Sequence, residues 1–232
     1  HQMALSECQM QNQPPDVTAW VARAEDLIAD DGPQAQPLLI EWLVQDTRGT
    51  EAAIILEAMM DRLGDTNPQV LTSRFTVAHQ LCITGDVQLG LRVFSKLAAD
   101  QDSMLGATHP DTLATRHNLA YWRGEIGDAA GAVADYAELL SLLEKVHAPD
   151  SPETLITRHN LANWRGEAGD MAGAAAAFAE LLPDVARVLG PEHPDTLTTR
   201  NNLAYWRGAA GDAAGAAAEF AALLPIKERV LG

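Results

Sequence analysis

Apolar and polar positions along most of this chain follow one pattern that returns every 42 residues. A ten-residue segment with the order Thr-Arg-His-Asn-Leu-Ala-Tyr-Trp-Arg-Gly begins at Thr115. Close copies begin at Thr157 and Thr199, and a degenerate copy that includes Thr72, Ser73 and Arg74 lies one period before the first. One aromatic residue then falls in each unit, at Phe94, Tyr136, Phe178 and Phe220. Self-similarity at a fixed period is typical of repeat architectures, so we predict a stack of similar units.

Each unit is predicted to hold two helices. Prolines 68, 110, 152 and 194 stand at the first helical position, where a missing N–H removes no hydrogen bond. The first helix ends at a Gly-Asp pair, because glycine adopts a left-handed conformation readily and aspartate caps the next helix. Asn67 and Ser151 are good N-caps, whereas His109 and His193 are poorer ones. Because prolines 183 and 225 fall inside the second helices of the last two units, we expect those helices to kink or restart.

The remaining chain is divided by the same reasoning. Residues 1–15 are predicted to form a flexible tail, and residues 16–64 an N-terminal helical cap or degenerate repeat, with helices over 16–30, 35–46 and 50–63. The four repeats are expected at 65–106, 107–148, 149–190 and 191–232. No polar capping helix follows the last repeat, so apolar surface should remain uncovered there. We expect either that the natural chain continues past Gly232 or that this end associates with another molecule.

Composition limits the classes of partner. The chain has 16 basic and 32 acidic residues, a formal net charge of −16. Such a surface repels phosphate backbones, so we expect no nucleic-acid ligand and favour a neutral or basic partner. The two cysteines show no metal-type spacing or disulfide framework, which fits a reducing cytoplasm. No signal peptide and no apolar run near eighteen residues is present, so we predict a cytoplasmic protein without membrane contact.

The repeated motifs resemble those of a known family. An Asn-Leu-Ala segment, a Gly-Asp pair, an alanine such as Ala132 and an aromatic residue four positions later are similar to the tetratricopeptide repeat. The 42-residue period and the His-Pro-Asp-Thr-Leu opening resemble the kinesin-light-chain-like subtype, over residues 65–232. This resemblance implies a right-handed α-solenoid of helix-turn-helix repeats. It also implies a non-enzymatic scaffold, without a cofactor, whose concave groove binds a protein or peptide.

Comparison of the three best copies locates the expected groove. Among the positions that differ, two are occupied by His117, His159 and Asn201 and by Tyr121, Asn163 and Tyr205. Their spacing of four places them on one face of the first helix. Because the packing positions stay constant, we expect this face to make no contact between repeats and to face solvent or ligand. The family resemblance favours ligand, since the first helices of such arrays line the groove.

An asparagine repeats beside this face. In related arrays this position hydrogen-bonds the backbone of a bound peptide, and an amide can both donate and accept. The alternative is that these asparagines only cap neighbouring helices. The predicted peptide-binding residues are Phe75, His79, His117, Asn118, Tyr121, His159, Asn160, Asn163, Asn201, Asn202 and Tyr205.

Other constellations are interpreted as structural. His79, His117 and His159 should lie on separate helices with axes about 8–10 Å apart, which is wide for shared metal coordination, so we predict no metal site. Tryptophans 122, 164 and 206 are expected to pack between helices, and arginines 74, 116, 158 and 200 to serve packing and salt bridges. Cys82 is interpreted as a buried apolar thiol. No nucleophile–base pair emerges, so we predict no enzymatic activity. A second functional hypothesis is a ligand-sensing, autoinhibitory module of a larger signalling ATPase of the STAND type.

Overall fold

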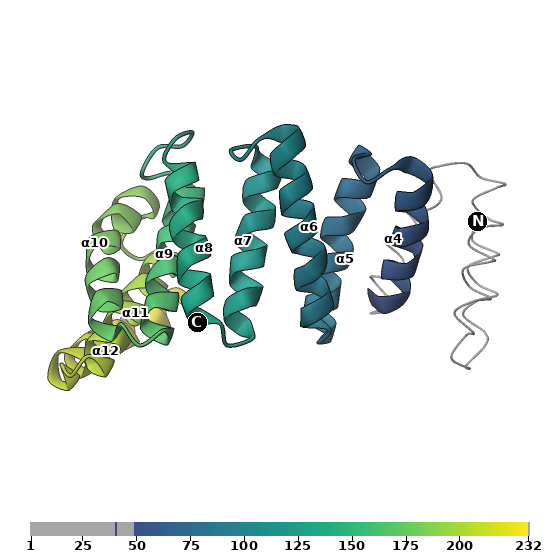
Figure 1. Ribbon diagram of the computed structural model, residues 1–232. Helices are drawn as coiled ribbons and strands as arrows, with labels where there is room; N and C mark the ends of the chain where they lie inside the picture. The colour runs from purple at the N-terminus through teal and green to yellow at the C-terminus, as the bar shows by residue number, and fades with distance from the viewer. Residues whose placement is uncertain (1–39, 41–48, 232) are drawn as a thin grey trace. The chain divides into compact units, whose positions relative to one another are not determined.

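The computed structural model describes residue 40 and residues 49–231, and every regular element in this part of the chain is an α-helix (Figure 1). The helices are α4 (Gly49–Leu63), α5 (Pro68–Thr84), α6 (Val87–Leu105), α7 (Pro110–Glu125), α8 (Ala129–Leu143), α9 (Pro152–Glu167), α10 (Met171–Leu189), α11 (Pro194–Ala209) and α12 (Ala213–Leu231). The predicted all-α fold is therefore confirmed. The predicted helix 50–63 corresponds to α4, whereas the tail, the helix expected at 16–30 and, apart from residue 40, the helix expected at 35–46 lie outside the described residues.

The chain divides into two compact units, residues 1–100 and 101–232. In the second unit, each helix from α7 to α12 contacts the next helix along the chain. The first helices of the repeats, α7, α9 and α11, also contact one another in that order. This places one helix of each pair in a common row, which is where the predicted groove residues of this unit lie. Within the described residues, no helix is long and apolar enough to cross a membrane.

Side-chain caps begin the first helices. The side chain of Asn67 accepts from the backbone N–H of Gln69, and that of Ser151 accepts from Thr154. His109 and His193 cap in the same way, because their Nδ1 atoms accept from the backbone N–H two residues later at 3.2 Å. We expected these histidines to be poorer caps and did not predict these hydrogen bonds. An imidazole nitrogen without a proton is an acceptor, and here it reaches the position that an asparagine oxygen takes in α5.

The second helices begin with aspartate caps and tolerate internal proline. Asp128 Oδ1 accepts from the backbone N–H of Gly131 at 2.9 Å, after Gly127 turns the chain at φ 94°. Of the expected kink or restart, the restart does not occur: helix α10 continues through Pro183, and α12 continues through its own internal proline. Leu181 and Val185 are buried in one cluster with Phe178, and this packing holds both sides of Pro183 in one helix.

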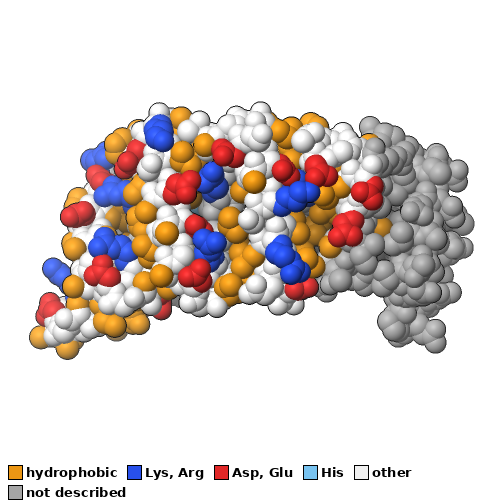
Figure 2. Space-filling view, viewed as in Figure 1, with side chains coloured by type: hydrophobic (Ala, Val, Ile, Leu, Met, Phe, Trp, Pro, Cys, Tyr) orange, Lys and Arg blue, Asp and Glu red, His pale blue; other side chains and the backbone are white. Residues whose placement is uncertain are grey.

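Ion pairs join the two helices of each repeat. Arg74 pairs with Asp100 at 2.6 Å and is almost fully buried, at 1% exposure. The arginines at the same position of the other repeats pair with acidic residues at varying positions of their second helices, Arg116 with Glu138, Arg158 with Asp184 and Arg200 with Glu219, at 2.7, 2.8 and 2.7 Å. These contacts confirm the interpretation of the repeated arginines as structural. Basic and acidic side chains lie next to one another across the face shown in Figure 2.

Small residues allow the helices of a pair to approach closely. In the last repeat, a Cβ atom added to Gly208 would lie 3.1 Å from the Cβ of Ala216. In the first repeat the glycine lies on the second helix instead. A Cβ atom added to Gly90 of α6 would collide with Sγ of Cys82 on α5. Cys82 is a free, buried thiol whose pKa burial raises to about 11, as expected for a structural cysteine.

Candidate functional site

The groove residues predicted for the first unit lie together on α5. The rings of Phe75 and His79 are stacked, with centroids 6.5 Å apart. Phe75 also contacts the buried ring of Phe94 edge-on, at 5.6 Å. These side chains therefore belong to the packing between α5 and α6 as well as to the surface of α5.

The two histidines of the second unit are half-buried between helices. His117 contacts the ring of Tyr136 edge-on at 5.4 Å, and His159 contacts Phe178 at 5.0 Å. Burial lowers the pKa of both histidines, because desolvation disfavours the imidazolium form. They are therefore neutral near pH 7. The described residues contain no group of three histidine, cysteine or acidic side chains suited to a metal ion.

The repeated asparagines turn their amide nitrogens toward the protein. The amide nitrogen of Asn118 donates to the carbonyl oxygen of Ala114 at 2.9 Å. That of Asn160 donates to Tyr136 Oη at 3.4 Å, and that of Asn202 lies 3.2 Å from His159 Nε2. No described residue donates to the three amide oxygens, and none of these oxygens is among the buried polar atoms without a partner. Each asparagine thus has a structural role and retains one solvent-accessible acceptor.

The variable face does contact the next repeat, contrary to expectation. Asn163 Oδ1 accepts a hydrogen bond from the indole nitrogen of Trp206 at 3.3 Å. Its equivalent Tyr121 contacts the ring of Trp164 edge-on at 6.4 Å. The side chain can vary because an aromatic edge and an amide oxygen both make acceptable contacts with the same tryptophan. On α11, Tyr205 packs beside its neighbouring tryptophan, and Asn201 Oδ1 accepts from Lys227 Nζ at 3.0 Å.

The tryptophans pack between repeats, as predicted. A Cβ atom on Gly166 would lie 2.5 Å from ring atoms of Trp206, and a Cβ on Gly124 would collide with Trp164. Each indole is therefore seated against a bare backbone segment of the preceding first helix. This role of the glycines was not predicted, although a glycine stands two residues after the tryptophan in all three copies.

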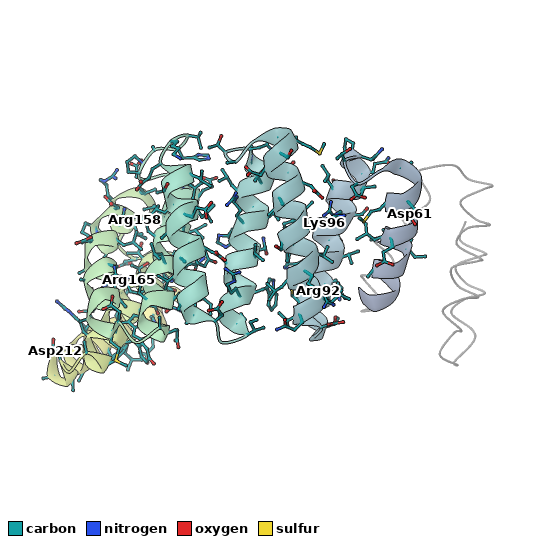
Figure 3. All side chains as sticks on the ribbon, viewed as in Figure 1. Asp61, Arg92, Lys96, Arg158, Arg165 and Asp212 are labelled. Carbon is teal, nitrogen blue, oxygen red and sulfur yellow. The ribbon has the colours of Figure 1, made fainter. Side chains whose placement is uncertain are left out.

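A pocket lies between α9, the C-terminal part of α10 and the N-terminal part of α11. It has a volume of about 320 Å³. Its lining residues are Pro152, Leu155, Ile156, His159, Asn160, Val185, Val188, Leu189, Asp195, Thr198 and Thr199. The first five of these belong to α9, the helix on which Figure 3 labels Arg158 and Arg165.

Only His159 and Asn160 of the predicted residues line this pocket. Its most exposed apolar side chain is Ile156, at 54%. Ile156 was not predicted, yet the signal was present: the same position is Thr72, Ala114 and Thr198 in the other copies, one turn before the variable histidine position. Extending the comparison of copies by one helical turn would have included it.

Comparisons with known proteins agree with this geometry. Residues 112–153 and 154–195 each match the family model of the tetratricopeptide repeat. A comparison with curated protein sequences finds no match.

Solved structures with similar folds include nearly identical TPR-like repeats attributed to a kinesin light chain of Podosopora anserina, at 24% identity and a TM-score of 0.71. That match covers 86% of this chain and 98% of the other. BtubC (BKLC) from P. vanneervenii is 16% identical, with a TM-score of 0.71 and coverage of 93% and 90%. MamA from Desulfovibrio magneticus RS-1 is 14% identical, with a TM-score of 0.62 and coverage of 86% and 97%. Residues 112–195 therefore match two tetratricopeptide repeats, and the chain has an all-α solenoid fold similar to the TPR-like repeats of these solved structures.

Proposed function

We propose that this protein is a non-enzymatic scaffold that binds an extended peptide segment of a partner along its first helices. The fold is one that other proteins use for protein interaction, since stacked repeats offer extended binding surfaces. The observation that carries the proposal is the apolar pocket between α9, α10 and α11, with exposed Ile156 at its edge. A buried free thiol at Cys82 suits a reducing cytoplasm as the place of action.

The asparagine oxygens supply the polar part of this proposed site. An extended peptide needs acceptors for its backbone N–H groups, because leaving them unpaired in an interface costs free energy. Asn118, Asn160 and Asn202 each retain an accessible amide oxygen, at intervals of one repeat. A peptide that follows the row of first helices would meet one acceptor per repeat and the apolar pocket beside the second.

Selection from a peptide library tests the proposal and requires no identified partner. The immobilised chain would be panned against a displayed library of random peptides, and the affinities of the selected peptides measured by calorimetry. Replacing Ile156 with aspartate should weaken binding at least tenfold, because the carboxylate would be desolvated beside an apolar ligand group. Leu224→Asp is the matched control, since Leu224 is equally exposed, at 59%, but lies on α12 outside the pocket.

The asparagines are tested with the same peptides. If each amide supplies one net hydrogen bond of about 1 kcal/mol, the double variant Asn118→Ala/Asn160→Ala should bind roughly thirtyfold more weakly. Its thermal unfolding, followed by circular dichroism, reports the loss of the contact between Asn160 and Tyr136 separately. Selected peptides that bind both the Ile156→Asp and the double-asparagine variants with wild-type affinity would contradict the proposed groove.

A further inference from the structure

The pocket between α9, α10 and α11 combines an apolar lining with one carboxylate that no basic side chain neutralises. Asp195 is the only acidic residue among its lining residues, which include no lysine or arginine. The side chain of Asp195 is 74% exposed, so it is open to a ligand. His159 lines the same pocket, so the two side chains border the same space.

The nearest histidine does not neutralise this carboxylate. His193 Nδ1 lies 3.6 Å from Asp195 Oδ2, but the same nitrogen accepts the backbone N–H of Asp195 as the helix cap. An atom that accepts a hydrogen bond in this way carries no proton to donate to the carboxylate. The N-terminus of α11 offsets about half a unit of negative charge, so the mouth of the pocket stays negative.

The arginines around the pocket are already paired. Arg158 binds Asp184 at 2.8 Å, and Arg187 binds Asp150 at 3.0 Å. Neither arginine lines the pocket. A ligand that enters therefore meets apolar side chains and the charge of Asp195, on a chain whose formal net charge is −16.

We infer that this pocket recognises an aliphatic side chain next to a lysine or arginine in the bound peptide. The aliphatic group lies against Ile156, Val188 and Leu189, and the basic group lies beside Asp195 at the mouth. A volume of about 320 Å³ is at the lower end of the range of about 300–1,000 Å³ for pockets that bind small groups. Charge complementarity of this kind supplies specificity more than affinity, and it selects against acidic peptides. This inference rests on the proposed peptide-binding function.

An array of defined peptides tests the inferred side-chain preference separately from the proposed peptide-binding function. The probes are acetylated and amidated peptides with a fixed central pair, Leu-Arg, Leu-Glu, Ser-Arg or Ser-Glu, between randomised positions. The labelled full chain should be retained by the Leu-Arg set about tenfold more strongly than by the Leu-Glu or Ser-Arg sets. With Asp195→Asn, the difference between Leu-Arg and Leu-Glu should shrink to less than about threefold, and Ile156→Thr should weaken both leucine sets.

Matched controls exist two repeats before Asp195, on α7, and on α12. Asp111 follows a histidine cap at the same helix position of α7 and does not line the pocket, so Asp111→Asn should change no preference. Leu224→Thr should likewise leave binding unchanged. Strongest retention by the Leu-Glu set, or a Leu-Arg preference that survives Asp195→Asn, would overturn the inference and leave the proposed function standing. Equal retention of all four sets by wild type and by the Ile156→Thr variant would overturn both.

Discussion

Replacing Gly166 with alanine should destabilise the protein, although alanine is the better helix former. Gly166 lies inside α9, where Trp206 of the next repeat is seated against its backbone. The new Cβ atom would lie 2.5 Å from two carbons of the indole ring. The ring cannot move aside easily, because Trp206 is buried, contacts Tyr205 at 4.8 Å and donates to Asn163.

Two opposing effects set the change in unfolding free energy that we expect for Gly166→Ala. Alanine stabilises a helix interior over glycine by about 0.8–1.0 kcal/mol. Forcing a methyl group into a packed contact costs about 1–3 kcal/mol. The net effect should be a destabilisation of up to about 2 kcal/mol, and a lower melting temperature by up to about 8 °C for a chain of this size. Gly208→Ala is the control at the same position of α11, where only Ala216 approaches the new atom, at 3.1 Å. That variant should be neutral or stabilised by up to about 1 kcal/mol.

Urea unfolding followed by far-UV circular dichroism gives both midpoints. In a Trp206→Ala background the obstruction is gone, so Gly166→Ala should there become neutral or stabilising. If Gly166→Ala proves as stable as Gly208→Ala in the wild-type background, the ring does not occupy this site. The seating of tryptophan on glycine between repeats would then be refuted.

Three further predictions concern charge and burial. Arg74→Ala should lower the unfolding free energy by about 3–5 kcal/mol, because Arg74 is buried and Asp100 would lose its partner. Arg165→Ala, at an exposed ion pair, should lower it by less than about 1 kcal/mol. Equal urea midpoints for the two variants would contradict this prediction. Burial lowers the pKa of His117 and His159, so the unfolded chain binds protons first as the pH falls, and stability should decline below about pH 6.5. The variant His117→Gln/His159→Gln should show a smaller decline between pH 7.5 and pH 5 when urea midpoints are compared. In a Cys8→Ser background, Cys82 should resist a maleimide reagent at pH 8 until urea unfolds the chain, because burial raises its pKa to about 11; rapid modification of the folded protein would disprove its burial.

Local signals made the helix boundaries predictable. Prolines at the first helical position and Gly-Asp pairs act within a few residues, and the first helices α5, α7, α9 and α11 begin and end near them. The constancy of the arginines and tryptophans correctly indicated packing. The internal proline of α10 does not restart the helix, because buried neighbours on both sides hold it in one helix.

The partners of the site residues could not be predicted from spacing alone. Asn160 contacts Tyr136, which lies 24 residues earlier, and Asn163 contacts Trp206, 43 residues later. Variation between copies was interpreted as freedom from packing, yet two chemically different side chains serve the same tryptophan. The pocket is formed where three helices meet, so no single helix pattern contains it.

The seating of Trp164 and Trp206 on glycines has a consequence for how such a gene can change. Trp122, Trp164 and Trp206 are identical, and so are the glycines that follow them, so the junctions between the last three repeats are interchangeable. Unequal crossing-over that deletes residues 149–190 would bring Trp206 opposite Gly124, the partner that Trp164 has now. The shortened array would keep the same contact between tryptophan and glycine at the new junction, but would lose Ile156 and the rest of the α9 surface. Recombination can therefore add or remove a recognition surface in steps of 42 residues without creating a new kind of interface between repeats.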